Sequence, residues 1–98
     1  MLTSKDRAVL KRIASSQSAV YQIGKDGLSE LNLSGILEAL TARELIKINV
    51  LQNCDETPKD LALKISETLK CEIVGVIGRK IIIYKLNPKN KKHILEIK

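Results

Sequence analysis

The sequence predicts a single α/β domain in which helices pack on a mixed four-stranded sheet. Stretches with helical apolar spacing alternate with short β-branched stretches, in the order α-β-α-β-α-β-β. Strands joined by a helix are expected to be parallel neighbours with a right-handed crossover, whereas the two last strands, joined by a tight turn, must be antiparallel. The length of 98 residues suits one domain, residues 1–98.

The first predicted helix lies in "MLTSKDRAVLKRIASS". Thr3 or Ser4 can cap it, and Asp6 falls in the first turn, where a carboxylate complements the helix dipole. Its apolar stripe consists of Leu2, Val9, Leu10 and Ile13. Around the stripe are the cations Lys5, Arg7, Lys11 and Arg12, the densest positive charge before the C-terminal tail.

A short strand and a second helix follow. "AVYQI", residues 19–23, is typical of a strand, and Ser29 can cap a helix over "SELNLSGILEALTARE". Gly35 inside this helix costs about 1 kcal/mol relative to Ala, which predicts a close packing partner there. The predicted apolar stripe is Leu33, Ile36, Leu37 and Leu40.

"LIKINVLQN" alternates, which indicates a half-buried strand. Its core face would hold Ile46, Ile48 and Val50, and its solvent face Lys47 and Asn49. The third helix starts at Thr57 as N-cap, with Pro58 at the first helical position and Asp60 completing a pair that resembles a capping box. Its stripe is Leu61, Ala62, Ile65, Ser66 and Leu69.

The segment "CEIVGVIGRKIIIYKL" predicts a central hairpin around Gly78, Arg79 and Lys80. Gly75 inside its first strand indicates a bulge or a close backbone approach. Residues 87–98 form a basic tail, frayed or anchored as an extra strand by its apolar residues Ile94, Leu95 and Ile97.

Charge points to a polyanionic partner. The seventeen Lys and Arg outnumber the eleven Asp and Glu and give a net charge of +6. This charge favours nucleic acid as the first candidate partner and an anionic membrane surface as the second. No apolar stretch approaches the roughly 20 residues of a membrane span, and the N-terminus lacks a secretory signal. We therefore expect a cytoplasmic protein without a membrane role.

The sequence offers little for catalysis. Cys54 and Cys71 form no CxxC pair and His93 stands alone in the tail, so the metal ligands are too few and the thiols are expected to be reduced. No nucleophile–base pair, P-loop or dinucleotide fingerprint is present. We expect no enzyme, no cofactor, no metal and no small-molecule substrate.

The pair Gly24 and Gly27 joins the first strand to the second helix. Glycines without Cβ would let a sugar-phosphate backbone approach the free N–H groups of the helix start, and Lys25 would add a charge. KH modules clamp backbone nucleotides with such a GXXG loop. Asp26 repels phosphate, unless its carboxylate turns back to stabilise the turn.

Aromatic residues are scarce, with no Phe or Trp and only Tyr21 and Tyr84. Modules that stack bases on a sheet need exposed aromatics. If the chain binds nucleic acid, it should read phosphates and shape more than base edges.

Three stretches carry a resemblance: "VYQIGKDGLSE", "ALTARELIKINVL" and "CEIVGVIGRKIIIYKL". Together they resemble the bacterial single-domain members of the CRM (chloroplast RNA splicing and ribosome maturation) family, called YhbY-like, from the first helix to about Leu86. The resemblance implies a fold like that of KH modules and of the C-terminal domain of translation initiation factor three. It also implies a non-catalytic protein that binds ribosomal RNA in a precursor of the large subunit.

The resemblance assigns RNA contact to the loop of Gly24, Lys25, Asp26 and Gly27, where Asp26 replaces an expected basic or neutral residue. Charge placement adds Lys5, Lys11, Arg12, Arg79 and Lys80 as RNA-binding candidates. We expect a monomer whose partner is RNA. Two alternatives stay open: a winged-helix DNA-binding module with the basic hairpin as its wing, and an adaptor that docks on a ribosomal protein.

Overall fold

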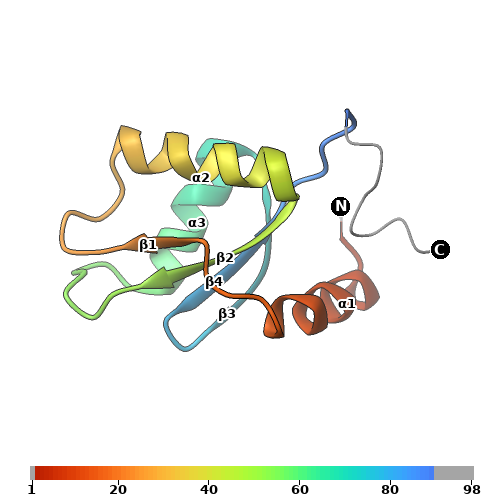
Figure 1. Ribbon diagram of the computed structural model, residues 1–98. Helices are drawn as coiled ribbons and strands as arrows, with labels where there is room; N and C mark the ends of the chain where they lie inside the picture. The colour runs from red at the N-terminus through yellow and green to blue at the C-terminus, as the bar shows by residue number, and fades with distance from the viewer. Residues whose placement is uncertain (1, 90–98) are drawn as a thin grey trace.

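The computed structural model describes residues 2–89, and the order of elements is the predicted one. The predicted extra strand around Ile94, Leu95 and Ile97, together with His93, lies outside the described residues. The elements, labelled in Figure 1, are α1 (Ser4–Ser15), β1 (Tyr21–Ile23), α2 (Glu30–Arg43), β2 (Leu45–Val50), α3 (Pro58–Leu69), β3 (Glu72–Ile77) and β4 (Lys80–Tyr84).

The four strands form one mixed sheet in the order β1-β2-β4-β3, which confirms the predicted fold class. β1 runs parallel to β2, with Tyr21 opposite Ile48, and β4 runs antiparallel to both β2 and β3. The expectation that β2 and β3 would be neighbours was wrong. They run in the same direction, but β4 lies between them, so the hairpin contributes one central and one edge strand.

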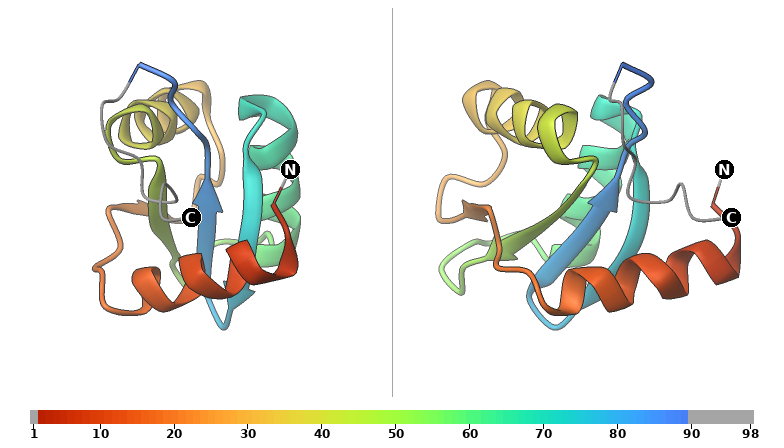
Figure 2. Two further views of the ribbon diagram at one scale, coloured as in Figure 1. Left: turned by 90° about the vertical axis from the view of Figure 1, so that its right-hand side faces the viewer. Right: turned by 45° about the vertical axis from the view of Figure 1, so that its right-hand side comes forward.

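Helices cover both faces of the sheet. α2 and α3 lie on one face, where they bury the larger core around Ile36, Ile48 and Ile65. α1 crosses the opposite face, which we call the outer face (Figure 2), and packs Leu10 and Ala14 on the sheet. The outer core consists of Leu10, Ala14, Leu45, Val74, Ile82 and Tyr84.

The packing of α1 on the outer face corrects the prediction of a half-buried β2. Every residue of β2 except Asn49 is buried, and only 9% of Lys47 is exposed. The alternation of the strand is real, but α1 covers part of the face that the alternation assigns to solvent. A second correction concerns Leu37 in α2. It was expected in the apolar stripe and is instead exposed to solvent.

The predicted helix starts are confirmed. Thr3 caps α1 in a reciprocal capping box with Asp6, and Ser29 and Thr57 cap the other two helices through their side-chain oxygens. Pro58 stands at the start of α3 as expected. These caps satisfy backbone N–H groups that a helix leaves without intrahelical partners.

Both glycines that interrupt regular elements have close neighbours. A Cβ at Gly35 would lie 2.9 Å from Cε1 of Tyr21, so the predicted packing partner is the Tyr21 ring. At Gly75 the pairing with β4 shifts register, and a Cβ would lie 2.7 Å from Cε of Lys11. The second glycine therefore combines both predicted features, the bulge and the close approach.

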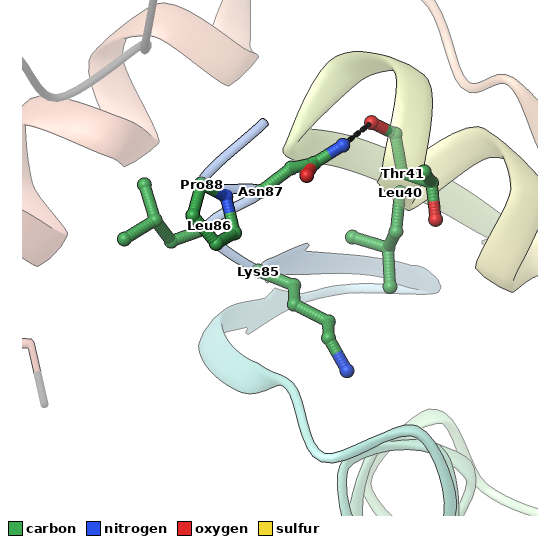
Figure 3. A pocket seen from close by; sticks show the side chains of 6 residues that line it. All are labelled: Leu40, Thr41, Lys85, Leu86, Asn87 and Pro88. Carbon is green, nitrogen blue, oxygen red and sulfur yellow. Dashed lines mark hydrogen bonds between the residues drawn. The ribbon is translucent and has the colours of Figure 1, made fainter. Parts of the chain in front are cut away.

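The segment after β4 is tied to the end of α2. Glu44, with φ of 67°, offers its carbonyl to Lys85 N at 2.8 Å and its carboxylate to Asn87 N at 2.9 Å. Asn87 also donates through its side chain to the carbonyl of Thr41, the dashed line in Figure 3. These bonds fix the residues that border a small pocket, drawn in Figure 3 and lined by Leu40, Thr41, Lys85, Leu86, Asn87 and Pro88.

Candidate nucleic-acid interface

Three connections meet at one end of the sheet. β1 and β2 both end there, with Ile23 opposite Val50, and β4 begins there, with Lys80 opposite Asn49. The GKDG loop (residues 24–27) and the β2–α3 connection (residues 51–57) therefore lie on the left of Figure 1, with the β3–β4 turn below them. The topology thus brings the predicted loop and the predicted hairpin cations to the same end of the molecule.

The GKDG loop is a tight turn held by side chains behind it. Gly27 N donates to the Gly24 carbonyl at 3.0 Å, and Lys25 and Asp26 are exposed at the tip. Asn32 Nδ2 donates to the Gly27 carbonyl at 2.7 Å, and its Oδ1 accepts from the Tyr21 hydroxyl at 2.7 Å. Tyr21 of the strand therefore orients Asn32 of the helix, and Asn32 holds the loop.

Gly27 faces protein. It is buried, its φ is +66°, and a Cβ there would lie 3.1 Å from Oε2 of Glu56. Glu56 forms an ion pair with Lys64, and this hydrogen bond raises the pKa of Lys64 above its ordinary value. Backbone approach, which the sequence suggested for both glycines, is thus hindered at Gly27 because Glu56 covers it.

Arg79 fixes the start of the β2–α3 connection, which lies behind the loop. Its Nε donates to the Val50 carbonyl at 2.9 Å, and its Nη2 donates to the Leu51 carbonyl at 2.8 Å. The Leu51 side chain in turn lies against Gly24, where a Cβ would come within 3.3 Å of Leu51 Cδ1. Of the two hairpin candidates, Arg79 is partly buried and engaged in these bonds, whereas Lys80 is exposed.

The three candidates on α1 are exposed but do not point the same way. Lys5 and Arg12, seven residues apart, share the side of the helix away from the buried Leu10. Lys11 lies over Gly75 of β3 and lines a pocket together with Lys80. The structure thus brings Lys11 and Lys80 together and separates them from Lys5 and Arg12.

Lys47, which the sequence did not single out, lines the same pocket. Alternation placed it on a solvent face, where a strand lysine has no special meaning. Because α1 packs over this face, Lys47 is buried and lines a pocket with Lys11 and Lys80. Only the tertiary packing of α1 could have identified it.

Charge is divided between the two layers. Residues 24–44 and 51–70, which hold α2, α3 and their leading loops, contain eight carboxylates and five cations. The other set, which we call the basic layer, comprises α1, β2 and the β3–β4 hairpin, with two carboxylates and seven cations. Its carboxylates are Asp6 and Glu72, and its cations are Lys5, Arg7, Lys11, Arg12, Lys47, Arg79 and Lys80. The excess of positive charge therefore lies in the basic layer, and three of its cations, Lys11, Lys47 and Lys80, line one pocket.

One member of the basic layer is committed to the fold. Arg7 donates to the carbonyls of Ile73 and Leu2, at 3.3 and 3.1 Å, and forms an ion pair with Glu72 at 3.7 Å. The sequence did not name it as a contact, and its geometry indicates a structural role.

Residues 2–89 offer neither a metal site nor a membrane-spanning helix. That part of the chain contains no group of three or more His, Cys, Asp or Glu side chains placed to hold a metal ion. Nor does it contain a helix with the length and apolar character needed to cross a membrane.

Comparison with known proteins gives consistent results. YqeI, named a probable RNA-binding protein of Bacillus subtilis, is 39% identical over 92 residues, which are 94% of this chain and 96% of YqeI. An RNA-binding protein of Haemophilus influenzae is 32% identical over 84 residues, covering 86% of this chain and 85% of its own.

The solution structure of a hypothetical Staphylococcus aureus protein, itself a proposed RNA binder, matches with a TM-score of 0.79 and 42% identity. The match covers 93% of this chain and 95% of that one, so the two share a fold. The model of the CRS1 / YhbY (CRM) domain matches residues 2–85, nearly all of the described part. The resemblance seen in the sequence is thereby confirmed, and the chain belongs to the CRS1 / YhbY (CRM) domain family.

Proposed function

We propose that this protein binds RNA through its basic layer and the adjoining GKDG loop, as a non-catalytic assembly factor of the large ribosomal subunit. The observation that carries the proposal is the division of charge, seven cations against two carboxylates in the basic layer. Relatives named RNA-binding proteins support RNA as the polyanion. The resemblance to YhbY-like proteins supports ribosomal RNA in a precursor particle.

The mode of binding is phosphate contact. Both tyrosines are used by the fold: the Tyr21 hydroxyl bonds Asn32, and Tyr84 is only 6% exposed in the outer core. With neither ring presented as a stacking platform, lysine and arginine contacts to the backbone are the main source of affinity. Such contacts position a protein on RNA by shape more than by base sequence.

The winged-helix alternative has little structural support. β2 separates α2 from α3, so these helices do not form the adjacent pair that a helix-turn-helix places on DNA. Comparing affinities for structured ribosomal RNA and duplex DNA of matched length at equal salt tests this point. We expect tighter binding to RNA.

Salt dependence and charge removal test the proposal. Affinity for a transcript of large-subunit ribosomal RNA should fall steeply with salt, because binding releases counterions from phosphates. The double variant Lys5→Gln/Arg12→Gln, on the basic layer, should weaken binding and reduce the salt slope. Lys59→Gln/Lys70→Gln removes two exposed cations from the ends of α3 and serves as the control of equal charge. Equal losses in both variants, or no measurable binding by the unaltered protein, would refute RNA binding by this layer.

The ribosomal partner needs a test in cells. Crosslinking followed by sequencing of the attached RNA should recover large-subunit ribosomal RNA. Treatment of extracts with nuclease should release the protein from precursor particles. Retention after complete digestion would instead favour the adaptor that docks on a ribosomal protein.

A further inference from the structure

A pocket of about 180 Å³ opens on the outer face, beside the C-terminal half of α1. Its walls come from α1, β2 and the β3–β4 hairpin, elements brought together only by the fold. We call it the three-lysine pocket. It is lined by Lys11, Ser15, Lys47, Ile77, Lys80 and Ile82.

Lys47 supplies the buried cation of the pocket. It stands in the middle of β2, opposite Ile82 of β4, and is 91% covered. Its Nζ donates to the carbonyl of Gln17 at 2.8 Å, in the connection that follows α1. A lysine ammonium has three donors, so this bond leaves donor capacity for a ligand.

Lys11 is placed by the bulge of β3. Its side chain runs over Gly75 so closely that a Cβ there would meet Cε at 2.7 Å. A glycine at the bulge thus makes room for the Lys11 stem, which passes over β3 as the side chain lines the pocket. Lys80, the third cation, begins β4 opposite Ile77 and is exposed.

The cluster carries no compensating acid. Among residues 2–89, neither of the two ion pairs involves any of the three lysines, and no carboxylate lines the pocket. Like charges gathered at a partly desolvated site repel one another more strongly than in bulk water. Binding an anion between them would relieve that repulsion and supply the missing partner.

The other residues that line the pocket indicate which kind of anion fits it. Ile77 and Ile82 offer apolar surface, with Ile77 58% exposed, and Ser15 adds a hydroxyl. A free inorganic anion uses no apolar surface, whereas a phosphodiester brings a ribose whose carbon atoms can lie on it. The combination of cations with an exposed isoleucine fits a nucleotide backbone unit.

We propose that the three-lysine pocket binds one phosphodiester of RNA, with the attached ribose against Ile77. The proposal rests on the proposed RNA binding and specifies where one backbone contact is made. The pocket is separate from the GKDG loop: no residue of the loop lines it. RNA would therefore be held at two points of the protein surface.

A first experiment needs no RNA. The backbone amide signals of the protein are followed by NMR during titration with inorganic phosphate, against chloride at equal ionic strength. We expect saturable shifts centred on Ser15, Lys47 and Ile82. Shifts spread evenly over all lysine-rich surfaces, or absent at these residues, would overturn the pocket even if RNA binding itself is confirmed.

A second experiment measures affinity for a labelled oligouridylate over a range of salt. Lys11→Gln and Lys80→Gln should each weaken binding about threefold and lower the salt slope by about 0.7, the value of one single-strand phosphate contact. Lys70→Gln is the control of equal charge. DNA of the corresponding sequence and vesicles containing phosphatidylglycerol test other sources of the phosphate, and tighter binding to either would overturn the assignment to RNA.

Gly75→Ala separates position from charge. The new methyl group must displace the Lys11 stem, which is flexible, so we expect the fold to be retained while the net charge is unchanged. We expect the RNA affinity of Gly75→Ala to fall as far as that of Lys11→Gln, with the double variant no weaker than either. Additive losses would refute the placement of Lys11 in the pocket. If phosphate binds the pocket while the unaltered protein ignores RNA, the proposed function fails and the anion site remains.

Discussion

Arg79 and Leu51, 28 residues apart, are joined by a hydrogen bond of 2.8 Å from the guanidinium Nη2 to the backbone carbonyl. A second bond, from Nε to the Val50 carbonyl, is 2.9 Å long. Through Leu51, which lies against Gly24, the hairpin turn supports the back of the GKDG loop. A cation that the sequence suggests for RNA contact is thus also part of the framework.

Replacing Arg79 should therefore cost stability. Arg79→Gln removes two hydrogen bonds from a charged donor at a partly buried site, and we expect the free energy of unfolding to fall by about 2 kcal/mol. Urea denaturation measures it, and Lys80→Gln, at the exposed neighbouring position, should change it by less than about 0.5 kcal/mol. Equal stabilities of the two variants would show that the guanidinium bonds contribute nothing.

Gly35 is expected to reject even a methyl group. Alanine improves helix propensity by about 1 kcal/mol, but its Cβ would lie 2.9 Å from Cε1 of the Tyr21 ring, so we expect Gly35→Ala to destabilise the protein by about 1–2 kcal/mol net. A double-mutant cycle with Tyr21→Ala provides the check by thermal or urea unfolding. Once the ring is absent, Gly35→Ala should become stabilising, and persistence of its cost would assign the cost to another contact.

Local signals predicted most of the fold. The caps at Thr3, Ser29 and Thr57 mark helix starts because their side chains bond backbone N–H groups close in sequence. Gly35 and Gly75 signalled close approaches correctly, but their partners, Tyr21 and Lys11, are set by tertiary packing that no local pattern contains.

The site was less predictable for the same reason. Lys47 was expected to face solvent because the alternation of residues in β2 distinguishes its two faces but does not show what covers them. The cover on the Lys47 face depends on where α1 packs. The interposition of β4 between β2 and β3 is likewise a long-range choice. The RNA contacts assigned to the GKDG loop and to Lys5, Lys11, Arg12, Arg79 and Lys80 remain predictions, since the structure gives the positions of these residues and holds no RNA.

The opposite charges of Lys25 and Asp26, at the exposed tip of the GKDG loop, should affect RNA affinity in opposite directions. If the loop contacts phosphate, Lys25→Ala should weaken RNA binding about threefold, and Asp26→Asn should strengthen it by removing a repulsive charge. Both side chains are exposed, so unfolding free energies should stay within about 0.5 kcal/mol of the unaltered protein. Fluorescence anisotropy with ribosomal RNA fragments measures the effect, and unchanged affinity in both variants would remove the loop from the interface.

Cys71 should react slowly with alkylating reagents. Burial raises the pKa of its thiol to about 11 from 9.0, so at about pH 8 it holds roughly a hundredfold less thiolate than an ordinary cysteine. Iodoacetamide labelling followed by mass spectrometry checks the rate against the urea-unfolded chain. Because the folded pKa exceeds the unfolded one, this group's contribution to stability is complete below pH 9 and declines as pH rises toward 11. Cys71→Ala should lack that decline, and labelling as fast as in the unfolded chain would refute the burial.

Lys47→Met should separate RNA binding from folding. Methionine preserves most of the apolar stem that packs in the sheet and removes only the ammonium, which donates to the Gln17 carbonyl. Losing that bond costs about 1 kcal/mol, while removing a buried cation that lies beside Lys11 and Lys80 offsets part of the cost. We therefore expect the free energy of unfolding to change by less than about 1 kcal/mol while RNA affinity falls about threefold. A purely structural lysine would show the reverse, a clear loss of stability with RNA affinity unchanged in the folded fraction.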